Sequence, residues 1–158
     1  MMRVQACELC DGDGGSPIFR SAKWRVVRVT GTDGEAFPGF CRVVWNEHVR
    51  EMSELDAADR ALFMEAVFRV EGALRAALKP HKMNLASLGN LTPHLHWHVI
   101  PRYQDDIAYP KPIWAVTLAA TQAGQGLGTL AHRRSKQSAQ TDTDSQWELA
   151  VRRALETT

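Results

Sequence analysis

Three histidines, His94, His96 and His98, alternate with apolar residues in the segment HLHWHVI at 94–100. Such alternation is typical of a β-strand with one polar and one apolar face, so the three imidazoles should point the same way. Imidazole is substantially neutral at pH 7 because its reference pKa is about 6.5, and it can therefore attack without strong activation. A strand that crowds three titratable rings onto one face loses core area, which favours a chemical role.

The strand spacing argues against one metal ion bound by all three histidines. Residues two apart on a strand are about 6.5 Å apart and residues four apart about 13 Å. Zinc–nitrogen bonds are about 2.0–2.1 Å long. Neighbouring histidines could share an ion, but the outer two could hardly reach the same one without a bulge. At least one ring is therefore free to act as nucleophile or proton donor.

A second candidate group is the Cys-x-x-Cys pair, Cys7 and Cys10. Three cysteines are too few for a disulfide scaffold, so the pair indicates a metal or redox site. The alternative is a turn that carries two ordinary thiols. Cys41 lies in an apolar segment and is expected to be a buried thiol.

The elements that position these residues can be predicted from their patterns. Two β-branched segments at 24–30 and 40–45 predict antiparallel strands, joined by a turn at 31–35. Ser53 is the expected N-cap of an amphipathic helix that ends near Leu78, before a proline. A third strand is expected at 82–88, and Pro93 and Pro101 should bound the histidine strand. Loops are expected at 11–17 and 102–112.

The composition is that of an ordinary globular chain, with 158 residues, 44% of them hydrophobic and 23% charged. A net charge of +1 provides no electrostatic case for a nucleic acid or an anionic membrane as main partner. The chain has no apolar signal segment and no long apolar run, so we expect neither secretion nor a membrane span, and hence a cytoplasmic location.

The motif His-apolar-His-apolar-His-apolar-apolar resembles the defining motif of the histidine triad (HIT) family of nucleotide hydrolases and transferases. The long helix, Asn84, the Gly89-Asn90 turn and the Pro101-Arg102 pair follow in the family's order, and the resemblance covers roughly residues 5–115. It implies an α/β (α+β) fold, with a mainly antiparallel sheet of about five strands, one long helix packed on it and a homodimer. The HIT domain is expected at 1–118. A flexible linker and a short C-terminal helix, at 146–155, are expected within 119–158.

The resemblance also implies roles for individual residues. His96 would attack the α-phosphate of a nucleotide and form a nucleotidyl-histidine intermediate, with its other ring nitrogen bonded to a backbone carbonyl. His98 would hold a phosphate oxygen or assist the leaving group. Asn84 and Asn90 match positions that hold ribose or phosphate, although either could be a plain turn residue. Leu91 departs from the pattern, since many relatives carry a polar residue there. Thr92 or a backbone N–H could replace that contact.

Several bacterial HIT proteins join a Cys-x-x-Cys pair to two histidines, and the matching residues here are Cys7, Cys10, His48 and His94. Two thiolates and two imidazoles make a closed tetrahedral shell, typical of structural zinc. Such an ion would tie the N-terminal segment to the histidine strand and would not activate water.

Other residues receive weaker interpretations. Arg102 could steer phosphate, but an ordinary solvated charge is favoured. Trp97 is expected to pack in the core, and Trp24 and Phe40 are candidates for the base pocket. The remaining histidines, His81 and His132, are expected at the surface.

Three functions remain open. The first is hydrolysis of a dinucleoside polyphosphate or a nucleoside phosphoramidate. The second is nucleotidyl transfer to a phosphate acceptor, although so short a chain leaves little room for a second substrate. The third is a nucleotide-binding or scaffold module with little turnover, in which the tail binds a partner.

Overall fold

The part of the chain that the structure describes forms one five-stranded antiparallel sheet, as expected from the sequence. The structure, a computed structural model, describes residues 7–115 and 140–156. The strands lie in the order β1-β2-β3-β5-β4, and every neighbouring pair is antiparallel. Their bounds are β1 Ser16–Arg20, β2 Trp24–Arg28, β3 Cys41–Trp45, β4 Lys82–Ala86 and β5 His96–Arg102. The two strands predicted at 24–30 and 40–45 are neighbours, as β2 and β3.

The long helix α3 spans Ala57–Leu78 and begins later than predicted. Its N-cap is Asp56, whose carboxylate accepts the backbone N–H of Asp59 at 2.8 Å, and not Ser53. Ser53 lies in a short 3-10 turn, η1 Met52–Glu54, which a capping box closes. Asp56 is the better N-cap because its carboxylate accepts a free N–H of the first turn and interacts favourably with the positive end of the helix dipole.

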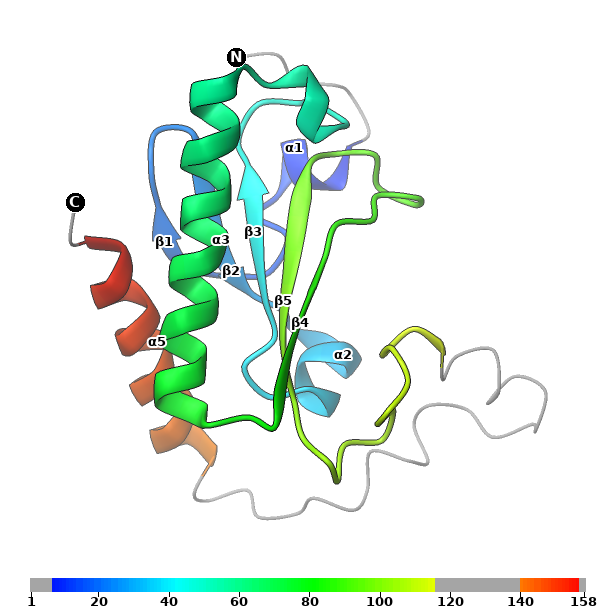
Figure 1. The fold of residues 1–158 in the computed structure, drawn as a ribbon, viewed down its shortest axis with the longest axis vertical. Helices are drawn as coiled ribbons and strands as arrows, with labels where there is room; N and C mark the ends of the chain where they lie inside the picture. Colours follow the sequence, from blue (N-terminus) through cyan, green and yellow to red (C-terminus); the bar gives the residue numbers. More distant parts are fainter. Residues whose placement is uncertain (1–6, 116–139, 157–158) are drawn as a thin grey trace.

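One face of the sheet is covered by two helices, which lie side by side in Figure 1. Helix α3 packs on the central strands, and α5, Gln140–Glu156, lies beside α3 and against β1. Phe63 of α3 meets Trp45 of β3 edge-on, with ring centroids 5.3 Å apart. Trp147 of α5 is buried in the same core. Helix α5 thus extends the hydrophobic layer that the sequence predicted for the long helix alone.

Shorter segments cover the opposite face, which carries the histidines. These are α1 Glu8–Asp11, α2 Gly31–Ala36 and the loop after β5. The turn predicted at 31–35 is in fact α2, where a Cβ on Gly34 would lie 2.1 Å from the carbonyl oxygen of Val29. The loop predicted at 11–17 is shorter, since β1 starts at Ser16. Both differences reflect tertiary packing, which overrides weak local turn preferences.

The histidine strand is displaced from its predicted bounds. It begins at His96, so His94 precedes it, and it runs through Pro101 to Arg102. Pro101 is tolerated because the pairing with β3 ends at Val99, after which only β4 is alongside. The strand predicted at 82–88 likewise ends early, at Ala86.

Helix α5 includes the predicted segment 146–155 and starts earlier. The linker predicted before it falls largely on residues 116–139, which lie outside the described residues. The division into 1–118 and 119–158 stays a prediction. Among the described helices, none is both long and apolar enough to cross a membrane.

Candidate functional site

The four residues predicted to bind a metal lie together at one end of the sheet. One donor atom from each of Cys7, Cys10, His48 and His94 lies within 4.8 Å of all the others. The sulfur–nitrogen separations are 3.5 Å for Cys7–His94, 3.4 Å for Cys10–His48 and 3.6 Å for Cys10–His94. Ideal tetrahedral bonds to zinc would place sulfur and nitrogen ligands about 3.6 Å apart. The donor set therefore fits a closed Cys2His2 centre.

The ligands are held by backbone contacts in the protein itself. His94 donates from Nε2 to the carbonyl of Trp45 at 2.7 Å, which leaves the lone pair of Nδ1 facing the two sulfurs. Burial is the main reason that the pKa of His94 is lowered, and it favours the neutral, ligating form. Cys7 is the N-cap of α1 and Cys10 lies within this helix. The buried Arg25 holds this segment through the carbonyls of Leu9, Gly12 and Asp13.

His96 and His98 form a close pair beside this centre. The Nδ1 of His96 donates to the carbonyl of His94 at 2.6 Å, so its Nε2 carries the lone pair. That Nε2 lies 3.1 Å from Nε2 of His98, which must then be the N–H donor. The remaining nitrogen of His98, Nδ1, is buried without a hydrogen-bond partner in the described structure. The backbone contact expected for the nucleophile is present.

Both rings of this pair are kept neutral by their surroundings. Burial lowers the pKa of His96, and the charge of Arg42 adds to it. Burial, His96 and Arg42 together lower the pKa of His98 to about 3. A neutral His96 has the free lone pair that a nucleophile needs, and a neutral His98 can donate a hydrogen bond at pH 7.

Aromatic rings surround His98 on the same face of the sheet. Trp114, from the loop after β5, lies 5.0 Å from the ring of His98, and Phe40 lies 5.6 Å from it. Of the two candidates for the base pocket, only Phe40 is near the histidine pair. Trp24 packs into the core under α3, on the other face, because it alternates with Arg25 on β2. Trp97 packs against that core, as predicted.

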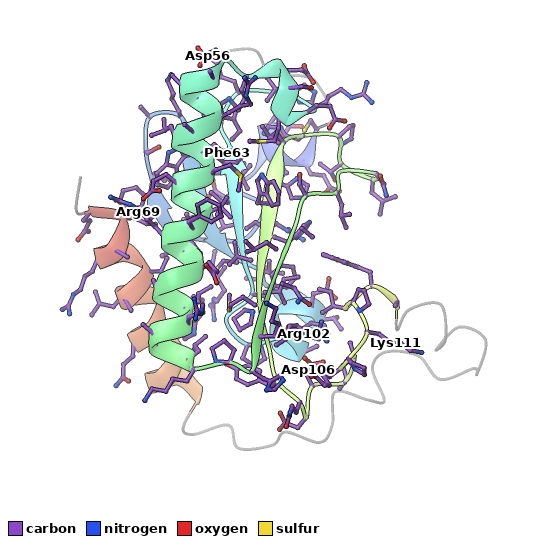
Figure 2. The ribbon with its side chains drawn as sticks, in the orientation of Figure 1. Asp56, Phe63, Arg69, Arg102, Asp106 and Lys111 are labelled. Carbon is purple, nitrogen blue, oxygen red and sulfur yellow. The ribbon has the colours of Figure 1, made fainter. Side chains whose placement is uncertain are left out.

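The expectation that Arg102 is a solvated charge is wrong. Arg102 is 2% exposed and binds Asp106 through two hydrogen bonds, of 2.7 and 2.9 Å. It also donates to Oδ1 of Asn84 at 2.7 Å and to the carbonyl of Lys111 at 2.9 Å. Figure 2 shows Arg102 and Asp106 close together where β5 ends. Arg102 thus organises the loop that carries Trp114 and orients the amide of Asn84.

The residues predicted to bind ribose or phosphate do not lie together. Asn84 pairs with Ile100 across β4 and β5, and so shares the histidine face of the sheet. Asn90 is exposed in the loop between β4 and β5, next to a fully exposed Leu91. The hydroxyl of Thr92 donates to the carboxylate of Glu8 at 3.4 Å.

Outside this site, Cys41 is fully buried, as predicted, and burial raises the pKa of its thiol. His81 is exposed, as predicted, whereas His132 lies outside the described residues.

Two arginines near the site, Arg25 and Arg42, were not predicted as site residues. Each is a cation within an apolar, β-branched strand. This pattern could have marked them as site residues, since such strands rarely bury an arginine without a partner. Arg25 supports the segment around α1 that carries Cys7 and Cys10, and Arg42 lies opposite His98.

The comparisons with known proteins agree with this geometry. The family model described as "HIT domain" matches residues 32–105. A histidine triad protein from Bradyrhizobium japonicum is similar, with 26% identity, coverage of 90% of this chain and 91% of that one, and a TM-score of 0.66. A search of curated proteins found no match.

Two further structures share the fold. A histidine triad protein from Marinobacter aquaeolei has 21% identity and a TM-score of 0.67, with 96% of each chain covered. A zinc-bound histidine triad family protein from Mycobacterium smegmatis has 16% identity and a TM-score of 0.59, covering 97% of this chain and 98% of that one.

Proposed function

The chain carries a HIT domain with the histidine triad fold, and from this premise we propose that it hydrolyses nucleotide derivatives by attack of His96 on their α-phosphate. The substrate would be a dinucleoside polyphosphate or a nucleoside phosphoramidate. The observation that carries the proposal is the hydrogen bond from Nδ1 of His96 to the carbonyl of His94, which leaves Nε2 unprotonated beside His98.

The reaction would take place in two steps. Nε2 of His96 forms a bond to the α-phosphorus while the bond to the leaving group breaks, and the leaving group departs with that electron pair. The leaving group of a polyphosphate departs as a phosphate anion, and that of a phosphoramidate takes up a proton from the solvent and departs as an amine. Water then attacks the phosphorus, the nitrogen–phosphorus bond breaks, and the nucleoside monophosphate leaves. A proton from that water passes to the solvent. The low pKa of His98 supports a role as a neutral donor to a phosphate oxygen rather than as a general acid.

Zinc is the ion proposed for the Cys2His2 centre. The two thiolates and two imidazoles, at separations that suit tetrahedral bonds, support it, and a zinc-bound protein shares the fold. When bound, the ion would supply a structural tie between the N-terminal segment and the chain entering β5. With four protein ligands, the centre would have no open position for water.

Assembly and location are proposed as well. We expect a homodimer, because β4 is an edge strand of the sheet and Phe68 on α3 is 51% exposed. A cytoplasmic location is in keeping with three free cysteines. Light scattering of the purified protein tests the dimer.

A nucleotide-product assay tests the activity. Wild type and His96→Ala are incubated with diadenosine polyphosphates and adenosine phosphoramidate, and the products are separated by chromatography. His81→Ala serves as the control, since that histidine is exposed and away from the pair. AMP from wild type and His81→Ala but not from His96→Ala is expected. Equal release from His96→Ala would exclude this nucleophile, and binding without release from any protein would favour a transferase or a binding module.

A further inference from the structure

Arg42 lies on β3 directly opposite His98 of β5. Cross-strand partners point to the same face of a sheet, with Cβ atoms about 4.5–5.5 Å apart. Arg42 therefore projects from the face that carries His96 and His98. The guanidinium lies 6.0 Å from the ring centre of Phe40, which in turn lies 5.6 Å from the ring of His98. The guanidinium of Arg42, the ring of Phe40 and the histidine pair therefore lie next to one another on this face of the sheet.

The hydrogen bonds of Arg42 leave much of its guanidinium unused. Nη1 donates to the carbonyl of Gly14 at 3.0 Å, whereas Nε is buried without a hydrogen-bond partner. Among the residues whose side chains the structure describes, no carboxylate forms an ion pair with Arg42. Burial lowers the pKa of Arg42, and Asp33 and Glu8 oppose this only by longer-range attraction.

Two buried arginines, Arg25 and Arg102, differ from the half-buried Arg42 in this respect. Arg102 binds a carboxylate, an amide and a carbonyl, and Arg25 binds three carbonyls and Asn46. A partly buried cation without a counter-ion lowers the stability of the folded state. Its position beside the histidine pair therefore indicates that a bound anion supplies the missing partner.

We propose that Arg42 binds the phosphate that follows the α-phosphate of the substrate, so that the site favours dinucleoside polyphosphates over nucleoside phosphoramidates. This inference rests on the proposed attack by His96. With the α-phosphorus at Nε2 of His96 and His98 alongside, Arg42 lies one strand further along the same face. A guanidinium presents a planar fork of donors that matches phosphate oxygens. A phosphoramidate has no second phosphate for this contact.

Binding measured without turnover tests the contact directly. α,β-methylene-ADP carries one more phosphoryl group than AMP, joined through a methylene bridge that prevents cleavage. Titration calorimetry at constant salt should show that wild type binds the second ligand about tenfold more tightly or better. Arg42→Met should lose this difference and retain its affinity for AMP, and Arg42→Lys should recover part of it. An undiminished difference in Arg42→Met, or no difference in wild type, would overturn the proposal.

Kinetics test the specificity. Arg42→Met should lower kcat/KM for diadenosine tetraphosphate about 10- to 100-fold, and lower it by less than about threefold for adenosine phosphoramidate. Arg75→Met, a charge loss on the α3 side of the sheet, should keep the wild-type ratio. Equal falls for the two substrates would overturn the inference and assign Arg42 a general structural role.

The two levels of proposal fail in different ways. Absence of His96-dependent AMP release from every substrate contradicts the proposed function. The difference in binding between AMP and α,β-methylene-ADP still decides the role of Arg42 in that case. Thermal midpoints and zinc contents of the variants show whether each protein is folded.

Discussion

The backbone carbonyl of His94 accepts a hydrogen bond of 2.6 Å from Nδ1 of His96, while the ring of His94 faces the sulfurs of Cys7 and Cys10. One residue thus belongs to the metal centre through its side chain and orients the proposed nucleophile through its backbone. The position of Nε2 of His96 therefore depends on how firmly His94 is held.

Loss of one thiolate should therefore affect both metal content and stability. We expect about one zinc per chain in wild type, and a lower zinc content and thermal midpoint in Cys7→Ser, because binding free energy contributes to folding. Elemental analysis and calorimetry measure these. Cys41→Ala is the control, since this buried thiol is outside the centre and its loss should leave zinc in place. Metal-free wild type with unchanged stability would contradict the zinc assignment.

The protonation of His98 should make the fold sensitive to acid. Burial, His96 and Arg42 lower its pKa from 6.5 to about 3, so below pH 6.5 the unfolded chain binds a proton that the folded chain does not. The contribution of this ring to stability is complete above pH 6.5 and is lost progressively as the pH falls toward 3. Urea unfolding from neutral to acidic pH should thus show a steeper loss in wild type than in His98→Asn. His81→Asn should keep the wild-type slope, and an equally steep loss in His98→Asn would contradict the prediction.

The ion pair between Arg102 and Asp106 should be strongly coupled, because their side chains are 3% and 5% exposed. Removal of either partner leaves a buried charge uncompensated, and we expect Arg102→Met or Asp106→Asn to lose about 3–5 kcal/mol of unfolding free energy. The double variant Arg102→Met/Asp106→Leu should recover part of the loss. Denaturant unfolding measures each value. Additive losses in the double variant would mean that the two residues act independently.

Helix α5 should contribute to the stability of the sheet domain through Trp147. This side chain is 2% exposed in the core that α3 and the sheet form. Trp147→Ala should lower the free energy of unfolding by about 3–5 kcal/mol. Leu149→Ala on the same helix should change it by less than about 0.5 kcal/mol, since Leu149 is 44% exposed. Similar, small effects of the two substitutions would show that α5 is only loosely attached.

Local patterns in the sequence were sufficient to predict the histidine strand and the long helix. Alternation of His94, His96 and His98 with apolar residues predicted the strand and the free histidines, and the apolar periodicity before Leu78 predicted the long helix. These features depend on neighbours along the chain, whose geometry is the same wherever the segment lies. The metal ligands came from a family resemblance, and the structure brings them together from distant segments.

The tertiary structure alone decided which side chains meet across the sheet. Period-two alternation places Trp24 and Arg25 on opposite faces of the sheet. Because both faces of this sheet are covered, the alternation does not show which of the two residues shares a face with the histidines. Only the pairing of β3 with β5 places Arg42 opposite His98. Only the fold of the loop after β5 buries Arg102 against Asp106. Burial and register arise from contacts between distant segments. The sequence alone therefore does not distinguish a charged residue in solvent from one beside the histidine pair.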